Sequence, residues 1–206
     1  MKQKKNGIIF ENAVDILKKR DPVLAKIIKN VGSCTLELEA NYFQSLAEAI
    51  LYQQLSLKAA SSIVKRFKNI YPMRSFPGPG DVLKTEDEKL RHAGISRQKI
   101  RYLKDLSKKF IEGIVKPSKF SDMDDDKIIE QLTKVKGIGR WTAEMFLIFS
   151  LGRPNVLPLD DLGLQKAIQK WYSFDNIPSK EEIRNIAKKW EPYCTVATWY
   201  LWKASE

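Results

Sequence analysis

The residues with the clearest potential for chemistry surround a Gly-x-Gly turn at residues 137–139. Lys134, Lys136 and Arg140 flank this turn, and apolar residues recur at helical spacing on either side of it. Glycine permits the positive φ angles of a tight turn and lets another molecule approach the backbone closely. The helix after the turn then begins with backbone N–H groups that have no partner inside the helix, at the positive end of the helix dipole. Such a helix start suits a phosphate group, although an ordinary helix–helix corner would use the same glycines.

Two adjacent carboxylates, Asp160 and Asp161, are the second candidate for chemistry. They follow a Gly- and Pro-containing loop at residues 151–158 and precede a predicted helix that begins near Leu162. A carboxylate at this place can cap the helix, or it can stabilise a positive charge that develops on a reacting sugar. The residue pattern alone supports both interpretations equally.

The composition limits other kinds of chemistry. The 206 residues include one histidine, His92, and two cysteines, Cys34 and Cys194. These counts argue against serine–histidine–aspartate catalysis, a disulfide framework and a zinc or iron–sulfur site built from cysteine alone. The net charge of +11 favours a polyanionic partner, either nucleic acid or an anionic membrane surface. No apolar run approaches the roughly 18 residues of a membrane span, and the charged start of the chain does not resemble a signal peptide.

Helices must position these residues, because apolar residues recur at helical spacing almost throughout the chain. Helices are expected at 22–30, 41–54, 57–70, the segment capped by Ser96, 124–134, 140–151, 161–172, 180–190 and 193–204. Residues 33–39 alternate weakly and could form a short strand, and residues 1–5 are expected to be a frayed basic tail. The acidic residues 121–126 lack the spacing of a calcium loop and indicate a helix start instead.

The string Leu-Thr-Lys-Val-Lys-Gly-Ile-Gly-Arg-Trp-Thr-Ala at 132–143, followed by the loop 151–158 and Asp161, resembles the helix-hairpin-helix DNA glycosylase superfamily. Within that superfamily the chain is most similar to the 3-methyladenine DNA glycosylase II (AlkA-type) family, because the stretches 52–56, 94–102 and 190–202 also agree. The resemblance runs from about residue 40 to the end of the chain. It implies an all-α fold of two helical lobes with a DNA-binding cleft between them. One lobe would span 42–152 and contain the helix-hairpin-helix, and the other would combine 1–41 with 153–206.

The resemblance also implies a function. It predicts a monofunctional DNA glycosylase that flips alkylated purines, of the 3-methyladenine and 7-methylguanine type, out of double-stranded DNA. Asp161 would assist hydrolysis of the N-glycosidic bond in base excision repair. Bifunctional relatives carry a lysine directly after the Gly-x-Gly-x of the hairpin, where this chain has Trp141. The enzyme is expected to act inside the cell as a monomer, on damaged DNA and not on a membrane, without a required cofactor.

Individual roles follow from the same resemblance. The expected base-pocket residues are Trp141, Trp202, Met145 and Leu162, whereas Trp171, Trp190 and Trp199 are expected to pack in the core. The expected DNA-intercalating residues are Gln54, Leu55 and Gln53, although Gln53 could equally end the 41–54 helix. The expected phosphate-binding residues of the hairpin are Gly137, Gly139, Lys134, Lys136, Arg140 and Thr142. The backbone carbonyls of Thr133, Val135 and Gly137 are the expected ligands of a monovalent cation, sodium or potassium.

Some residues depart from the family pattern. Met145 and Leu162 stand where AlkA has tyrosines, Cys194 stands where an arginine is usual, and Gln54 replaces an aliphatic wedge. Because Met145 and Leu162 make the expected pocket less aromatic than that of AlkA, the resemblance implies a narrower range of substrates.

Two other functions stay open from the sequence. The first is a superfamily glycosylase for mismatched or oxidised bases, against which Trp141, Trp202 and the missing lysine argue. The second is a non-catalytic helix-hairpin-helix protein that only binds DNA. Asp160 and Asp161 argue against this second function, because carboxylates that face DNA repel it.

Overall fold

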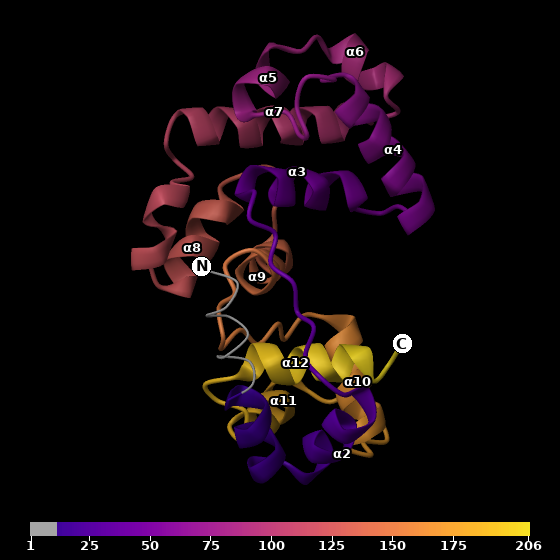
Figure 1. The fold of residues 1–206 in the computed structure, drawn as a ribbon, viewed down its shortest axis with the longest axis vertical. Coiled ribbons are helices and arrows are strands. Elements are labelled where there is room, and N and C mark those ends of the chain that lie inside the picture. The colour runs from indigo at the N-terminus through magenta and orange to yellow at the C-terminus, as the bar shows by residue number, and fades with distance from the viewer. Residues whose placement is uncertain (1–11) are drawn as a thin grey trace. The chain divides into compact units, whose positions relative to one another are not determined.

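The structure is a computed structural model that describes residues 12–206, and every regular element in this part of the chain is a helix (Figure 1). The predicted all-α fold is therefore confirmed, while the predicted basic tail at 1–5 lies outside the described residues. Within 12–206, no helix has both the length and the apolar composition needed to span a bilayer. Residues 12–20 are helical, and the later elements are α2 (Pro22–Val31), α3 (Tyr42–Tyr52), α4 (Leu57–Asn69), α5 (Pro79–Lys84), α6 (Asp87–His92), α7 (Arg97–Ile111), the 3₁₀ helix η1 (Pro117–Asp122), α8 (Asp125–Thr133), α9 (Arg140–Phe149), α10 (Leu162–Trp171), α11 (Lys180–Ala187) and α12 (Cys194–Lys203).

Side-chain caps explain where several of these helices begin. The Asn41 side chain accepts a hydrogen bond from the Gln44 amide at 3.0 Å before α3, and Ser96 caps α7 in the same way. Asp124 accepts from the Lys127 amide at 2.8 Å, so the acidic segment there starts α8, as predicted. Such caps satisfy amides that a helix start leaves unpaired. The short elements α5, α6 and η1 carry too few residues for a periodic signal, and the sequence pattern does not predict them.

The predicted short strand at residues 33–39 is wrong. These residues have neither helical nor strand backbone, and the described part of the chain offers no second strand with which they could pair. The segment still packs closely against its own unit. Leu38 lies so near Gly152 that a Cβ added to the glycine would come within 2.8 Å of the leucine Cδ1.

The chain divides into two compact units. The continuous unit is Glu39–Phe146, and the discontinuous unit combines the described residues up to Leu38 with Leu147–Glu206. The boundaries expected from the sequence lie at residues 42 and 152, so residues 39–41 and 147–152 belong to the other unit than expected.

The continuous unit is organised by α3, which packs against α4 and α7, and by α7, which also contacts α5 and α6 (Figure 1). Aromatic rings fill its interior in edge-to-face pairs, an arrangement that their charge distribution favours. Phe43 meets Phe110 at 5.3 Å between ring centroids, and Phe120 meets Phe146 at 5.7 Å. This packing fixes the start of α3, through Phe43, and the second half of α9, through Phe146.

In the discontinuous unit, α12 packs against α2 and α10 (Figure 1). Trp190 and Trp199 are buried in this unit, as predicted, whereas Trp171 is half-buried. All residues from Cys194 to Leu201 are buried, so α12 is the central helix of the unit.

A buried carboxylate joins distant parts of the discontinuous unit. Asp21 is 1% exposed, and its Oδ1 accepts from the Val23 and Leu24 amides at 2.9 and 3.2 Å, which caps α2. Its Oδ2 accepts from the Tyr172 hydroxyl at 2.7 Å and from the Trp190 indole N–H at 2.9 Å. Burial, and then the nearby Asp21 carboxylate, raise the pKa of Tyr172, which keeps this hydroxyl a donor. Four donors thus offset the cost of burying the charge.

Candidate functional site

Asp161 lies at the N-terminus of α10 and is held by two hydrogen bonds. Its Oδ1 accepts from the Leu164 amide at 2.6 Å, which caps the helix, and from the Trp202 indole N–H at 2.8 Å. Capping requires only the first of these bonds. The second fixes the direction of a half-buried carboxylate, and a carboxylate with a fixed direction is suited to stabilising a positive centre.

The neighbouring Asp160 has a different environment. It is exposed and forms an ion pair with Lys180. Exposed ion pairs of this kind contribute little to stability. The sequence does not decide which of the two carboxylates caps the helix and which is held for chemistry. In the structure Asp161 both caps α10 and has a fixed direction.

Two further side chains shape the Asp161–Trp202 pair. A Cβ added at Gly163 would lie 3.1 Å from Asp161 Oδ1 and 3.5 Å from the Trp202 ring, so a larger residue would crowd this bond. The Phe149 ring stacks on the indole, with centroids 5.8 Å apart and planes 17° apart. Trp202, expected only as a base-pocket ring, therefore also orients the candidate catalytic carboxylate.

The other expected base-pocket residues are distributed over both units. Leu162 is 52% exposed at the start of α10, and Trp141 is 46% exposed in the first turn of α9. Met145, one turn beyond Trp141, is half-buried. Exposed apolar surface of this kind suits contact with a ligand. Their grouping around one base stays a prediction.

The hairpin (residues 132–143) contains two glycines, Gly137 and Gly139, and a different structural feature explains each of them. Gly137 has a φ of +84°, and an added Cβ would lie 2.2 Å from the Tyr102 ring, so both backbone and space require glycine. Gly139 has an open Cβ position, and its carbonyl accepts the first hydrogen bond of α9 from Ala143 N at 3.1 Å. Within the described chain no atom occupies the space beside Gly139. A close approach from outside would explain a glycine there.

The hairpin cations are exposed, but two of them form ion pairs. Lys134 pairs with Glu130 at 3.0 Å, and Arg140 pairs with Glu144 at 3.0 Å. The Lys134–Glu130 pair is exposed on both sides and weak enough for a phosphate to displace. Glu144 is buried, so only the exposed part of the Arg140 guanidinium can also face a phosphate. Thr142 is 7% exposed, so its hydroxyl is enclosed by the protein, and its predicted part in binding phosphate stays a prediction that concerns its backbone. Only its backbone amide, in the first turn of α9, can contribute.

Lys136 is tied to the protein through its backbone. Its amide donates to Asp105 Oδ2 at 2.8 Å, and the Lys109 ammonium lies 2.7 Å from the same oxygen. Burial would raise the pKa of Asp105, but these hydrogen bonds outweigh burial and lower it. The ionised Asp105 therefore anchors the hairpin to α7, and only the exposed side chain of Lys136 can face a phosphate.

The loop Gln53–Ser56, called the wedge loop below, joins α3 to α4. Gln54 is exposed and has a φ of +56°, which residues other than glycine rarely adopt. Strained backbone of this kind is concentrated at functional sites. Leu55 is 41% exposed, and the Ser56 hydroxyl caps α4 by accepting from the Ala59 amide at 3.3 Å. Gln54 and Leu55 both remain candidates for the DNA wedge.

Gln53 is not exposed with them. Its side-chain Nε2 donates to the Gly137 carbonyl at 2.7 Å. The prediction that Gln53 intercalates is therefore wrong, because its amide is already bound to the hairpin. The alternative that Gln53 ends the preceding helix agrees with its position directly after α3.

The same hydrogen bond uses one carbonyl of the expected cation site. The Gly137 carbonyl faces the Gln53 N–H, and the Val135 carbonyl accepts from Ile138 N at 3.1 Å. Each of these two carbonyls has a second lone pair, so one accepted hydrogen bond does not exclude a cation. Ligation of a sodium or potassium ion by the carbonyls of Thr133, Val135 and Gly137 stays a prediction, and the chemistry proposed below requires no such ion.

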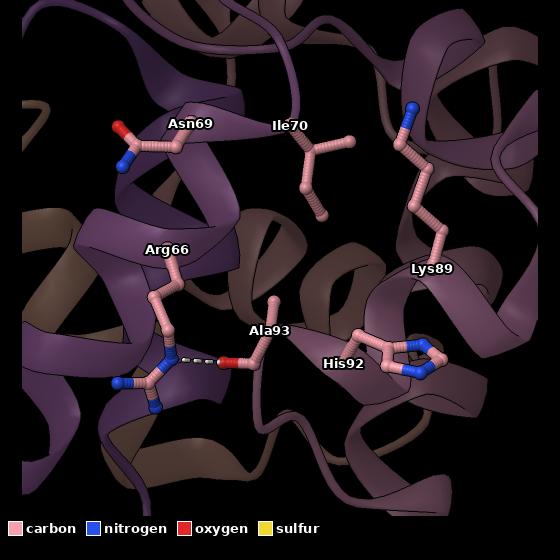
Figure 2. Close-up of a pocket in the computed structure, with 6 residues that line it drawn as sticks. All are labelled: Arg66, Asn69, Ile70, Lys89, His92 and Ala93. Atoms are coloured by element: carbon pink, nitrogen blue, oxygen red, sulfur yellow. Dashed lines mark hydrogen bonds between the residues drawn. The ribbon is translucent and has the colours of Figure 1, made fainter.

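A hollow elsewhere in the continuous unit shares no residue with these sites (Figure 2). It is lined by Arg66, Asn69, Ile70, Lys89, His92 and Ala93. Its cations stand in the last turns of α4 and α6, where they complement the helix dipoles, and Arg66 Nε donates to the Ala93 carbonyl at 2.9 Å. His92 is exposed at the end of α6, as predicted. The charge of this hollow therefore has a structural explanation.

Cys194 cannot replace the arginine that is usual at its position. It is 3% exposed, and burial, together with the nearby Glu191 charge, raises the pKa of its thiol to about 12. The thiol stays protonated and enclosed.

Sequence reasoning missed three residues that organise these sites. Gly163 has a signal, because glycine is a poor helix former and stands here in the first turn of a helix. Phe149 reads as an ordinary core residue. Lys99 reads as one of many surface cations, yet its Nζ donates to the carbonyls of Leu51 at 2.6 Å and Gln53 at 2.8 Å.

Comparison with known proteins matches residues 47–192 to the HhH-GPD superfamily base excision DNA repair protein family. DNA-3-methyladenine glycosylase 1 of Schizosaccharomyces pombe is 38% identical over 184 residues, which cover 89% of this chain and 81% of that protein. A crystal structure of DNA-3-methyladenine glycosidase from Bacillus halodurans matches with a TM-score of 0.86 and 38% identity, covering 94% of this chain and 88% of that chain. The S. pombe 3-methyladenine DNA glycosylase in complex with abasic DNA matches with a TM-score of 0.83 and 35% identity, covering 93% and 95% of the two chains.

Proposed function

Because the chain belongs to the HhH-GPD superfamily of base excision DNA repair proteins, we propose that it is a monofunctional DNA glycosylase that excises alkylated purines from double-stranded DNA. The observation that carries this proposal is the Asp161–Trp202 pair at the start of α10, with its 2.8 Å hydrogen bond. The names of the two relatives support 3-methyladenine as a substrate. The exposed apolar residues Trp141 and Leu162 suit flat cationic purines of this type and of the 7-methylguanine type.

The chemistry needs one carboxylate and a good leaving group. In the flipped nucleotide the bond between C1′ and the purine nitrogen breaks, and its electron pair leaves with the base, which alkylation has already made cationic. The Asp161 carboxylate stabilises the positive charge that develops on the sugar. Water then adds to C1′ and releases a proton, which leaves an abasic site. A cationic leaving group needs no general acid, so an enzyme without a histidine at this site can perform the reaction.

The base would be recognised by stacking. An indole face attracts a cationic purine through its electron density, and Trp141 offers such a face because it is 46% exposed. Leu162 and the half-buried Met145 stand where AlkA has tyrosines, and these aliphatic side chains favour a narrower substrate range than that of AlkA.

The direct test is incubation of the protein with methylated DNA, followed by chromatography of the released bases. We expect free methylpurines, an intact abasic site and no covalent complex after borohydride treatment, because Trp141 cannot form a Schiff base. Tight, salt-sensitive DNA binding with no freed base would instead indicate the non-catalytic binder. Release from oxidised or mismatched duplexes, but not from methylated DNA, would indicate the other glycosylase class.

Replacing Gly139 with serine should separate DNA binding from stability. Serine is a better helix cap than glycine, so the free energy of unfolding should rise by a few tenths of a kcal/mol. The new side chain would fill the open space and occupy amides that a phosphate needs. We expect binding to weaken about five- to tenfold on every DNA sequence, measured by fluorescence anisotropy at fixed salt. Unchanged affinity would remove Gly139 from the phosphate site.

Replacing Gln54 with glycine should separate the wedge from its backbone conformation. Glycine adopts the observed φ of +56° without strain, and this relief offsets its larger entropy in the unfolded chain. We therefore expect the free energy of unfolding to change by less than about 1 kcal/mol, while single-turnover excision falls. Leu55→Ala is the matched variant, and the larger loss of excision identifies the wedge. If neither substitution lowers the rate, the wedge lies outside this loop.

A further inference from the structure

The wedge loop is joined to the hairpin by hydrogen bonds that lie wholly within the continuous unit. Gln53 Nε2 bonds to the Gly137 carbonyl at 2.7 Å, which connects residues 84 positions apart in the chain. Lys99 Nζ bonds to the carbonyls of Leu51 at 2.6 Å and Gln53 at 2.8 Å. Three elements, α3, α7 and the hairpin, therefore meet at Gln53.

These bonds satisfy groups that the end of a helix leaves unpaired. The last carbonyls of α3 have no partner inside the helix, and the Lys99 ammonium supplies donors at the negative end of the dipole. Burial lowers the pKa of Lys99, so forming these contacts costs some solvation of the ammonium. Water could satisfy the carbonyls of Leu51 and Gln53 equally well. A lysine side chain from α7 does more than water, because it also holds the loop in place relative to α7.

The restraint acts where the backbone is strained. Gln54 follows Gln53 directly and has the φ of +56°, and strained residues persist only when their surroundings fix them. Gln53 fixes the loop from the hairpin side, and Lys99 fixes it from the α7 side. The hairpin is fixed in turn by Gly137 against the Tyr102 ring and by Lys136 N bonded to Asp105, both residues of α7.

We propose that Gln53 and Lys99 are positioning residues that hold the wedge loop at a set distance from the phosphate-binding hairpin, so that gripping the DNA backbone and inserting the wedge occur as one step. This inference rests on the proposed function. Gln53 does not enter DNA, and Lys99 does not bind phosphate. Both act through the position of Gln54 and Leu55.

The test separates grip from insertion. Gln53→Met keeps the size of the side chain and removes its donors, and Gln53→Asn keeps the amide but is too short to reach Gly137. Gln44→Met is the matched control, because Gln44 lies on α3 and bonds only within that helix, to Glu48 at 3.1 Å. Two quantities are measured for each variant: single-turnover excision of 7-methylguanine as a function of enzyme concentration, and the fluorescence of 2-aminopurine in the duplex, which rises when a base unstacks.

We expect both Gln53 variants to lower the maximal rate and the fluorescence rise about tenfold or more, because small misplacements of a positioned group are costly. The half-saturating concentration and its salt dependence should stay within about twofold, since the phosphate contacts remain. Lys99→Met should lower the maximal rate in the same way. In the double variant Gln53→Met/Lys99→Met, the fold-loss of the maximal rate should be smaller than the product of the two single fold-losses, because both residues act on one loop. A merely structural role would lower the melting temperature without this selective loss of rate.

Three results would overturn the inference. Wild-type maximal rates in Gln53→Asn and Gln53→Met would show that the Gln53–Gly137 hydrogen bond has no role in excision, while the proposed function stands. A raised half-saturating concentration at an unchanged maximal rate would place Gln53 in binding. If the wild-type protein neither unstacks 2-aminopurine nor frees a base, both proposals fail. If it unstacks 2-aminopurine but frees no base, only the proposed glycosylase fails, and the fluorescence of the Gln53 variants then tests the positioning role.

Discussion

Asp161→Asn should retain the fold and DNA binding but lose at least about a hundredfold in single-turnover excision of alkylated purines. Asparagine caps helices as well as aspartate does, and its side-chain oxygen can still accept from the Leu164 amide and the Trp202 indole. The substitution therefore removes the negative charge and little else. Any large loss of rate then reports on the interaction of that charge with the developing positive charge of the sugar.

The controls for this result come from the same segment. Asp160→Asn removes an equal charge one residue away, from an exposed ion pair with Lys180, and should leave excision unchanged. Asp161→Ala removes the cap as well and should lower the free energy of unfolding by about 1 kcal/mol beyond Asp161→Asn. Excision within about threefold of wild type in Asp161→Asn would mean that another group stabilises the transition state.

Gly137→Ala should cost about 3 kcal/mol of the free energy of unfolding, measured by urea denaturation. The positive φ of +84° accounts for about half of this cost, because a Cβ is unfavourable in that conformation. The remainder comes from the Tyr102 ring, 2.2 Å from the added atom, which must move out of a packed position. The Gln53 and Lys136 contacts of the hairpin should loosen with it.

A double variant divides these two contributions. Tyr102→Ala vacates the space, so Gly137→Ala made in that background should cost only the backbone strain, roughly 1–2 kcal/mol. Gly139→Ser, two residues away and without a positive φ, is the position control. Equal costs of Gly137→Ala in the wild-type and Tyr102→Ala backgrounds would show that the ring contact does not constrain the hairpin.

The parts of the site that could be predicted from the sequence depend on local chemistry. Asp161 at a helix start, Ser96 as a cap and the glycine turn before Arg140 are all marked by residue types at short spacing, and the structure places each of them where the pattern predicts. The roles of Gln53 and Lys99 could not be predicted in this way. They depend on contacts between residues 84 and 46 positions apart, for which the sequence carries no local signal.

Two wrong predictions have related causes. The strand at 33–39 was inferred from alternation alone, and alternation cannot reveal whether a partner strand exists. The intercalation of Gln53 is inferred from its place in the stretch 52–56, but its side chain is bound to the Gly137 carbonyl of the hairpin. In both cases the tertiary environment decides the outcome.

The buried Asp21 cluster sets an order for folding during synthesis. Asp21 can bind the Trp190 indole only after Trp190 has been synthesised, and Trp190 is 169 residues further along the chain. At about 5–20 residues per second, the ribosome delivers that partner roughly 10–30 s after α2 has emerged. The continuous unit Glu39–Phe146 can form completely in this interval, because all its residues have left the ribosome first. The hairpin and the wedge loop can therefore form before Trp190 completes the buried Asp21 cluster of the discontinuous unit.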